Sequence, residues 1–320
     1  MRSRWHSSWP EIGPDVSAPN PEGFVLKQLF NNRPTIAVLV VPGLFFLFFA
    51  MIIPIGFSVF YSLTDWQGIG DFSMIGVQNY LEILFADPTF WRSLMNVAIL
   101  IVVTIFIQNP LAFALAAVLA HITSSFSRVL RTIYFIPAVL SVVVITAMWS
   151  NMMNPTYGII DKFLIMVGLK SLAVSWLSNP ATALLSVIFI IIWQGFGWAL
   201  LFYYTGLMTV PKELEEAAIM DGANWFTTYA RVILPYLFPI ISAVIVIDVI
   251  SSMKQMEIIF LSTQGGPGDL TQFTAVYLYQ KAFTASQYGY GNALSVLFVI
   301  ISVGLTLLVQ RLFRTEREIK

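Results

Sequence analysis

The 320-residue chain contains no cysteine, two histidines and few charged residues. Without cysteine it has no disulfide, no thiolate metal ligand and no cysteine nucleophile. Charged residues make up 11% of the sequence, well below the roughly 25% of an average soluble domain. Hydrophobic residues make up 58%. A water-soluble globular protein is therefore excluded.

The sequence also lacks the motifs of a motor or of an enzyme. No G-x-x-x-x-G-K-[ST] sequence is present, so the chain has no phosphate-binding loop of this kind, and any ATP must be hydrolysed by another polypeptide. The two histidines, His6 and His121, lie in the N-terminal tail and at the end of an apolar segment, a placement that does not indicate a metal site. We predict no catalytic residue, no metal ligand and no cofactor bound by this chain.

Long apolar segments dominate what is present. A helix needs about 20 apolar residues to cross the ~30 Å hydrocarbon core of a membrane. Six segments are predicted to be transmembrane helices, at about residues 35–63, 94–120, 130–152, 181–208, 229–253 and 293–313. The predicted fold class is therefore all-α, a polytopic membrane protein with six transmembrane helices. Prolines inside several segments predict kinks, because each proline removes one helical hydrogen bond.

The distribution of basic residues predicts the orientation in the membrane. Of the 17 Lys and Arg residues, twelve lie in the N-terminal tail, in the loops after the second and fourth segments, and at the C-terminal end. By the positive-inside rule, the tails at 1–34 and 314–320 and the loop at 207–228 are expected to be cytoplasmic. The first tail has no apolar core of a cleavable signal peptide. The chain is thus predicted to be a multi-pass protein with both termini cytoplasmic.

The segment at 211–222 is charged and helix-prone, between two apolar segments. Pro211 suits the first position of a helix, and the glutamates that follow suit its positive N-terminal end. Ala217 and Ala218 place small side chains on a face that also includes Leu214 and Asp221. Gly222 is placed to end the helix in a left-handed conformation. These features favour docking onto a soluble partner. The alternative is a helix lying on the lipid surface, for which basic rather than acidic residues are typical.

The sequence Glu216-Ala217-Ala218, followed by Gly222 and Pro235, resembles the EAA loop of binding-protein-dependent ABC importers. Val232 departs from the isoleucine that is usual in that family. The resemblance implies a permease with the type-I ABC importer fold, like the maltose and molybdate permeases, with its transmembrane domain at 90–313. It also implies that 211–222 is a coupling helix, which docks in a cleft of a cytoplasmic ATPase. The positions that the resemblance assigns to ATPase coupling are Glu215, Glu216, Ala217, Ala218, Asp221, Gly222 and Pro235.

Four further segments, at 54–63, 76–80, 263–268 and 288–295, resemble the larger, first permease of carbohydrate importers. This resemblance implies a heterodimer with a second homologous permease in a bacterial or archaeal cytoplasmic (inner) membrane. The other implied partners are a cytoplasmic ABC ATPase dimer, which binds ATP and Mg, and an extracytoplasmic solute-binding protein. The implied substrate is a carbohydrate, and the implied surroundings are membrane lipid. No nucleic acid partner is expected.

Polar residues inside transmembrane segments are costly and therefore indicate function. Asp248 interrupts an apolar run, and Ser252 and Gln255 share its helical face. The alternative interpretation is that Asp248 is a structural acid bonded to a neighbouring helix and that the aromatic residues nearby only pack. The residues predicted to line a substrate path are Asn151, Trp193, Gln194, Trp198, Tyr203, Asp248, Ser252, Gln255, Tyr290 and Asn292.

Two other function classes remain open at this point. A secondary transporter or channel for a small polar solute predicts paired intramembrane acids, inverted repeats and no docking helix. Only Asp248 favours it. A membrane-embedded enzyme is opposed by the lack of paired titratable residues deep in the apolar segments. The sequence does not identify the sugar.

Overall fold

The structure is a computed structural model that describes residues 33–122 and 125–315, and these residues are helical apart from their connecting loops. No strand is assigned in these ranges beyond an isolated antiparallel bridge between Thr64 and Met74. The chain divides at Phe57–Ser58 into two compact units. The N-terminal tail predicted at 1–34 lies almost wholly outside the described residues, as does most of the tail predicted at 314–320. The predicted all-α membrane fold is confirmed.

The described part of the first unit is an apolar helix. It consists of α2 (Arg33–Leu47), a π-helical turn η1 (Phe48–Ile52) and the start of α3 (Ile53–Tyr61). From Ile36 to Tyr61 it is long and apolar enough to cross a membrane. Most of its described large side chains are exposed, as lipid-facing side chains are expected to be. This helix corresponds to the span predicted at 35–63.

The second unit contains the remaining elements. In chain order they are α4 (Gln78–Phe85), α5 (Pro88–Val103), η2 (Thr104–Gln108), α6 (Asn109–His121), α7 (Ser125–Val139), α8 (Val142–Met152), α9 (Ile159–Met166), η3 (Lys170–Leu172), α10 (Ala183–Leu207), α11 (Lys212–Met220), α12 (Trp225–Thr228), η4 (Tyr229–Ile233), α13 (Leu234–Tyr236), α14 (Phe238–Lys254), α15 (Glu257–Ser262), α16 (Thr274–Tyr279), η5 (Gln280–Thr284) and α17 (Tyr288–Thr315).

Three continuous helices of this unit are long and apolar enough to cross a membrane: Pro88–His121, Ala183–Leu207 and Tyr288–Phe313. Two more candidate spans are bent pairs, Ser125–Val139 with Val142–Met152 (98°) and Trp225–Tyr236 with Phe238–Ser262 (71°). If each bent pair is one span, the described residues contain six spans. The segments predicted at 130–152 and 229–253 are therefore broken rather than continuous helices.

Prolines account for these breaks. In the first bent pair Pro137 lies in the last turn of α7, where it removes a backbone donor, and the helix ends at Val139. In the second pair Pro235 and Pro239 are the second residues of α13 and α14. A proline is well tolerated at a helix start, because the N–H that it lacks would have no partner there. In the second pair the chain thus restarts its helix at each proline.

Three π-helical turns also precede prolines. In η1, η2 and η4 the residue just before the proline donates its N–H to the carbonyl five residues back. These bonds join Ile53 to Phe48, Asn109 to Thr104 and Leu234 to Tyr229. The following residues are Pro54, Pro110 and Pro235. A proline ring clashes with the carbonyl of the preceding turn, so widening that turn relieves the clash.

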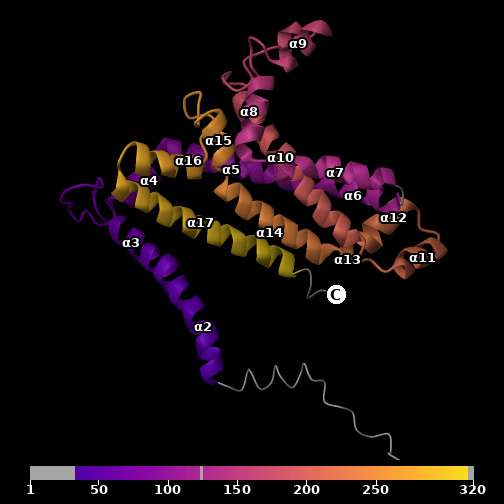
Figure 1. Cartoon of the computed structure of the whole chain (residues 1–320), viewed down its shortest axis with the longest axis horizontal. Helices are drawn as coiled ribbons and strands as arrows, with labels where there is room; N and C mark the ends of the chain where they lie inside the picture. The colour runs from indigo at the N-terminus through magenta and orange to yellow at the C-terminus, as the bar shows by residue number, and fades with distance from the viewer. Residues whose placement is uncertain (1–32, 123–124, 316–320) are drawn as a thin grey trace, which may run out of the picture. The chain divides into compact units, whose positions relative to one another are not determined.

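The core of the second unit forms around α10, which packs along α6 and α7 and also contacts α14 (Figure 1). Gly197 permits the approach of α10 to α7, since a Cβ at this position would lie 2.3 Å from the carbonyl oxygen of Tyr134. Figure 1 shows α11 at one end of this unit beside α12 and α13, and α4 and α16 at the other. The helices between these ends carry the candidate site.

Candidate functional site

A cavity of about 430 Å³ lies among the second to fifth spans. Its wall is formed by α5 and η2, the end of α7, the middle of α10 and the C-terminal half of α14. The polar residues in this wall are Thr104, Gln108, Gln194, Asp248, Ser251, Ser252 and Gln255. Such a concentration of hydroxyl, amide and carboxylate groups between apolar spans is costly unless it serves a solute or a partner.

Asp248 both lines this cavity and bonds to a neighbouring span. Its Oδ2 accepts a hydrogen bond of 2.8 Å from Nδ2 of Asn109, which is buried at the start of α6. The Oδ1 of Asn109 is buried without a hydrogen-bond partner. Both interpretations of Asp248 from the sequence therefore describe part of what it does. It is a cavity residue that is also held by a helix far away in the sequence.

Half of the residues predicted to line the substrate path meet at the cavity. They are Gln194, Trp198, Asp248, Ser252 and Gln255. Their helical spacing explains this result, since Asp248, Ser252 and Gln255 follow one another at four and three residues along α14. Trp198 adds a partly exposed aromatic ring to the wall.

The other half do not line this cavity. Tyr203 is buried in the core and packs edge-to-face on Phe113, and Trp193 packs edge-to-face on Trp149. The remaining three bond elsewhere: Asn151 accepts from the Tyr157 hydroxyl, Tyr290 donates to Asp87, and Asn292 donates to the carbonyl oxygen of Tyr288. The contacts of Tyr203 and Trp193 thus agree with the alternative interpretation from the sequence, in which the aromatic residues only pack.

Three cavity or cavity-supporting residues were missed from the sequence: Thr104, Gln108 and Asn109. The signal was present, because Gln108-Asn109-Pro110 interrupts the apolar segment at 94–120 just as Asp248 interrupts the fifth. Thr104 and Gln108 begin and end the π-helical turn η2. Turns of this kind occur frequently at functional sites.

The helix predicted at 211–222 is α11, at one end of the unit. Glu213 and Glu215 lie in its first turn, where the helix dipole stabilises negative charge. At its C-terminus Gly222 is left-handed, with φ of 81°. The N–H of Ala223 bonds to the carbonyl of Ala218 and the N–H of Gly222 to that of Ile219, both at 2.9 Å. This pattern resembles a Schellman stop, which is the role predicted for Gly222.

The exposed surface of α11 differs from the predicted face. Ala218 is 7% exposed and packs within the chain, whereas Ala217 is exposed. Successive helical residues are about 100° apart, so the two alanines do not share one surface. The exposed residues assigned to coupling are Glu216, Ala217, Asp221 and Gly222. Glu215 is half-buried, and Pro235 opens α13 outside the exposed part of α11.

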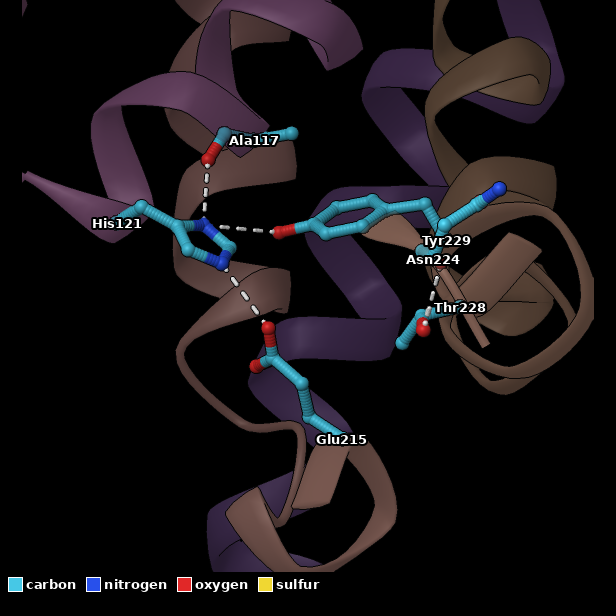
Figure 2. A network of polar contacts seen from close by, with 6 residues as sticks. All are labelled: Ala117, His121, Glu215, Asn224, Thr228 and Tyr229. Atoms are coloured by element: carbon cyan, nitrogen blue, oxygen red, sulfur yellow. Dashed lines mark hydrogen bonds and ion pairs between the residues drawn. The ribbon is translucent and has the colours of Figure 1, made fainter. Parts of the chain in front are cut away.

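His121, the last residue of α6, contacts this helix (Figure 2). Its Nε2 lies 3.0 Å from Oε1 of Glu215. Its Nδ1 lies 3.1 Å from the carbonyl oxygen of Ala117 and 3.2 Å from the hydroxyl of Tyr229 in η4. A cavity of about 370 Å³ adjoins this network and is also lined by Lys212. Nothing in the sequence signalled the contact, since the two partners are 94 residues apart.

Comparison with known proteins identifies the sequence family of the chain. Residues 108–315 match a sequence family described as "Binding-protein-dependent transport system inner membrane component". The chain is 33% identical over 290 residues to the probable ABC transporter permease protein YurN of Bacillus subtilis, covering 90% of this chain and 99% of that protein. It is 32% identical over 282 residues to the multiple sugar-binding transport system permease protein MsmF of Streptococcus mutans, covering 87% and 93%.

The fold is also found in solved structures. One is a chain of a bacterial ABC transporter involved in the import of the acidic polysaccharide alginate, with a TM-score of 0.77 and 21% identity, covering 91% of this chain and 99% of that one. A second, of an alginate ABC transporter in complex with an alginate pentasaccharide-bound periplasmic protein, gives a TM-score of 0.78 and 21% identity, covering 90% and 96%. At this identity the likeness establishes the architecture.

Proposed function

Because the chain belongs to the family of binding-protein-dependent transport system inner membrane components, we propose that it is a permease subunit of an ATP-driven importer of a sugar or oligosaccharide. Relatives named for the transport of multiple sugars and of trehalose and maltose support a saccharide cargo. In this proposal the chain forms one half of the pathway, and a second homologous permease forms the other half.

The polar cavity is the observation that carries the proposal. Hydroxyl, amide and carboxylate side chains donate and accept hydrogen bonds as sugar hydroxyls do, and they line a cavity of about 430 Å³ between membrane spans. The partly exposed ring of Trp198 offers an apolar face of the kind on which a sugar ring packs. Of the predicted path residues, Gln194, Trp198, Asp248, Ser252 and Gln255 are proposed to face the cargo.

The charge of the cavity favours an uncharged saccharide. Its lining contains one carboxylate, Asp248, and neither lysine nor arginine. An acidic sugar would meet this carboxylate without a compensating cation among the residues that line the cavity, and unpaired like charges at low dielectric repel strongly. The transporters of similar fold are described as alginate importers, so the proposed cargo differs from theirs in charge.

ATP binding and hydrolysis are assigned to a separate cytoplasmic subunit, so this chain is not itself an enzyme. The exposed residues of α11, with Glu216 pairing to a basic residue, are proposed to dock on that ATPase. Closure of the ATPase would move α11 and switch the pathway between inward- and outward-facing states. The proposed location is the cytoplasmic (inner) membrane with both termini inside, and a solute-binding protein delivers the cargo from outside.

Reconstitution in liposomes tests this proposal. The chain is assembled with the second permease and the ATPase, the solute-binding protein is added outside, and uptake of labelled maltose, trehalose and an alginate oligosaccharide is measured. We expect ATP-dependent uptake of a neutral sugar that requires the binding protein. Uptake driven by an ion gradient without ATP would instead indicate a secondary transporter. Uptake of the alginate oligosaccharide alone would contradict the assignment of an uncharged cargo.

A further inference from the structure

One side chain connects α11 to the second span. His121 ends the helix that runs from Pro88, and its Nε2 lies 3.0 Å from Oε1 of Glu215 in α11 (Figure 2). α11 also packs against α12 and η4, which are its successors along the chain. His121 thus gives α11 a direct contact with a helix that precedes it by some 90 residues.

The ring of His121 is held from two sides. Its Nδ1 lies 3.1 Å from the carbonyl oxygen of Ala117, one turn earlier in α6, and 3.2 Å from the hydroxyl of Tyr229. The carbonyl oxygen of Ala117 and the carboxylate of Glu215 are hydrogen-bond acceptors, and the two ring nitrogens of His121 face them from opposite sides of the ring. The orientation of the ring is therefore fixed by α6 and directed at α11.

The same helix leads to the transport cavity. Asn109 precedes His121 by twelve residues in α6, which corresponds to about 18 Å along a helix. At that point Asn109 donates to Asp248 in the cavity wall, and its neighbour Gln108 lines the cavity itself. An α-helix is a stiff element over this length, so a displacement at His121 is carried to Asn109.

We propose that His121 is a positioning residue for energy coupling. It ties Glu215 of α11 to the second span, and so transmits a displacement of α11 to the Asn109–Asp248 pair at the cavity wall. This inference rests on the proposed function, because it requires that an ATPase moves α11. It goes beyond the docking surface of α11, since neither His121 nor Glu215 needs to contact the ATPase for this role.

Because the His121–Glu215 pair is partly exposed, its role in coupling can be tested without a large effect on folding stability. The side chains of His121 and Glu215 are 42% and 34% exposed. Ion pairs with this exposure add little to folding stability. Replacing His121 is therefore expected to leave the assembled complex intact, and its effect is to be read in the response of the cavity to nucleotide.

The absence of cysteine in the chain allows a single reporter. A Ser251→Cys variant places one thiol at the cavity wall. In the assembled transporter, the rate at which N-ethylmaleimide labels this chain is measured with and without ATP and vanadate. We expect nucleotide to change the rate, and His121→Ala to reduce that change about fivefold, the lower range of coupling between two sites.

Two amide variants test whether the contact between Nε2 of His121 and Glu215 carries the nucleotide response. Glutamine at 121 places a donor near the position of Nε2 and keeps the contact with Glu215, whereas asparagine places one near Nδ1 and loses it. We expect His121→Gln to restore most of the nucleotide response and His121→Asn to behave like His121→Ala. Equal responses in both amide variants would overturn the role of the Glu215 contact.

The remaining outcomes separate this inference from the proposed function. A nucleotide-independent labelling rate with His121 in place would overturn both, because α11 would then not drive the cavity. A full response in His121→Ala would overturn this inference alone. Loss of the ATPase from the purified His121→Ala complex would also overturn it, since His121 would then serve docking. Tyr229→Phe, which removes only a hydroxyl at Nδ1, is expected to reduce the response less than His121→Ala.

Discussion

The amide nitrogen of Asn109 donates a 2.8 Å hydrogen bond to the carboxylate of Asp248, joining the second and fifth spans at the wall of the cavity. This contact gives Asp248 a partner within the chain while its carboxylate still faces the cavity. The pair therefore sets both the packing of two spans and the charge that a cargo meets.

Asp248→Asn tests the charge of the cavity. The amide keeps the size of the side chain and an oxygen that accepts from Asn109, but it removes the negative charge. We expect the ratio of acidic to neutral saccharide uptake in liposomes to rise about tenfold, the change that corresponds to 1.4 kcal/mol. Asp71→Asn, in an exposed loop outside the cavity, is the control and should leave the ratio unchanged. An unchanged ratio in Asp248→Asn would contradict selection by charge.

Glu216→Lys tests the docking surface. Glu216 is exposed on α11, so the substitution is expected to leave membrane insertion intact and to repel a basic partner surface. We expect the amount of ATPase that co-purifies with the chain to fall at least about tenfold, because removal of a charge pair at an interface costs about 2 kcal/mol or more and tenfold corresponds to about 1.4 kcal/mol. Glu213→Lys changes another exposed glutamate three residues away and should have the smaller effect. If Glu216→Lys kept the ATPase and full uptake, the coupling role of this helix would be wrong.

Two glycines of α10 form a matched pair for stability. At Gly197 a Cβ would lie 2.3 Å from the carbonyl oxygen of Tyr134, whereas at Gly195 the nearest atom would be 3.6 Å away, on Gln108. Gly197→Ala is expected to separate α10 from α7 and to cost about 1–3 kcal/mol, as overpacking does. Gly195→Ala should change stability by at most about 0.5 kcal/mol. Thermal unfolding in detergent measures both, and equal unfolding temperatures would contradict the close approach at Gly197.

Asp87 predicts an acid-dependent loss of stability at the α4–α5 end of the unit. Burial raises the pKa of Asp87, but hydrogen bonds from the hydroxyls of Tyr277 and Tyr290 and from the N–H groups of Phe90 and Thr89 outweigh burial. The pKa of Asp87 is therefore below its ordinary value of 3.8. Because the folded pKa is the lower one, the contribution to stability is complete above the unfolded pKa and is lost as the pH falls through the folded pKa.

The measurement for Asp87 is the unfolding temperature in detergent as a function of pH. The original chain is expected to lose stability below about pH 3.8, and Asp87→Asn to be less stable at neutral pH but flatter in acid. Asn at this position still caps α5, where Asp87 accepts from the N–H groups of Thr89 and Phe90. Parallel pH profiles for the two chains would show that another group causes the acid loss.

The helical membrane fold was predictable from the sequence because the signal of an apolar helix is local. Length and apolar content are properties of one segment, and the helices at 36–61, 88–121, 183–207 and 288–313 follow from them. The direction in which a helix bends cannot be predicted from one segment alone. Pro137 predicts that a helix is weakened, but the 98° turn after Val139 depends on what α8 packs against, which includes α15.

The cavity was predictable only in part for the same reason. Asp248, Ser252 and Gln255 share a helical face. Once one of them is assigned to the cavity, helical spacing assigns the other two. Tyr203 and Tyr290 have the side chains that a sugar site uses, but residue type does not reveal which way a helix faces. Tyr290 instead bonds to Asp87, 203 residues earlier in the chain. Such a pairing is a property of the assembled bundle.

The π-helical turn η2 sets the rotation of the second span. Leu100, Thr104, Gln108, Ala112 and Ala116 recur every fourth residue, and all are buried. In an uninterrupted α-helix each step of four residues rotates by about 40° around the axis, so these five side chains would spread over about 160°. The surplus residue of one π turn takes back about 100° and reduces the offset between Leu100 and Ala116 to about 60°. Leu100, before the turn, and Ala116, after it, can therefore both face inward on one helix. The proline that follows the turn thus decides which way the polar side of the span points.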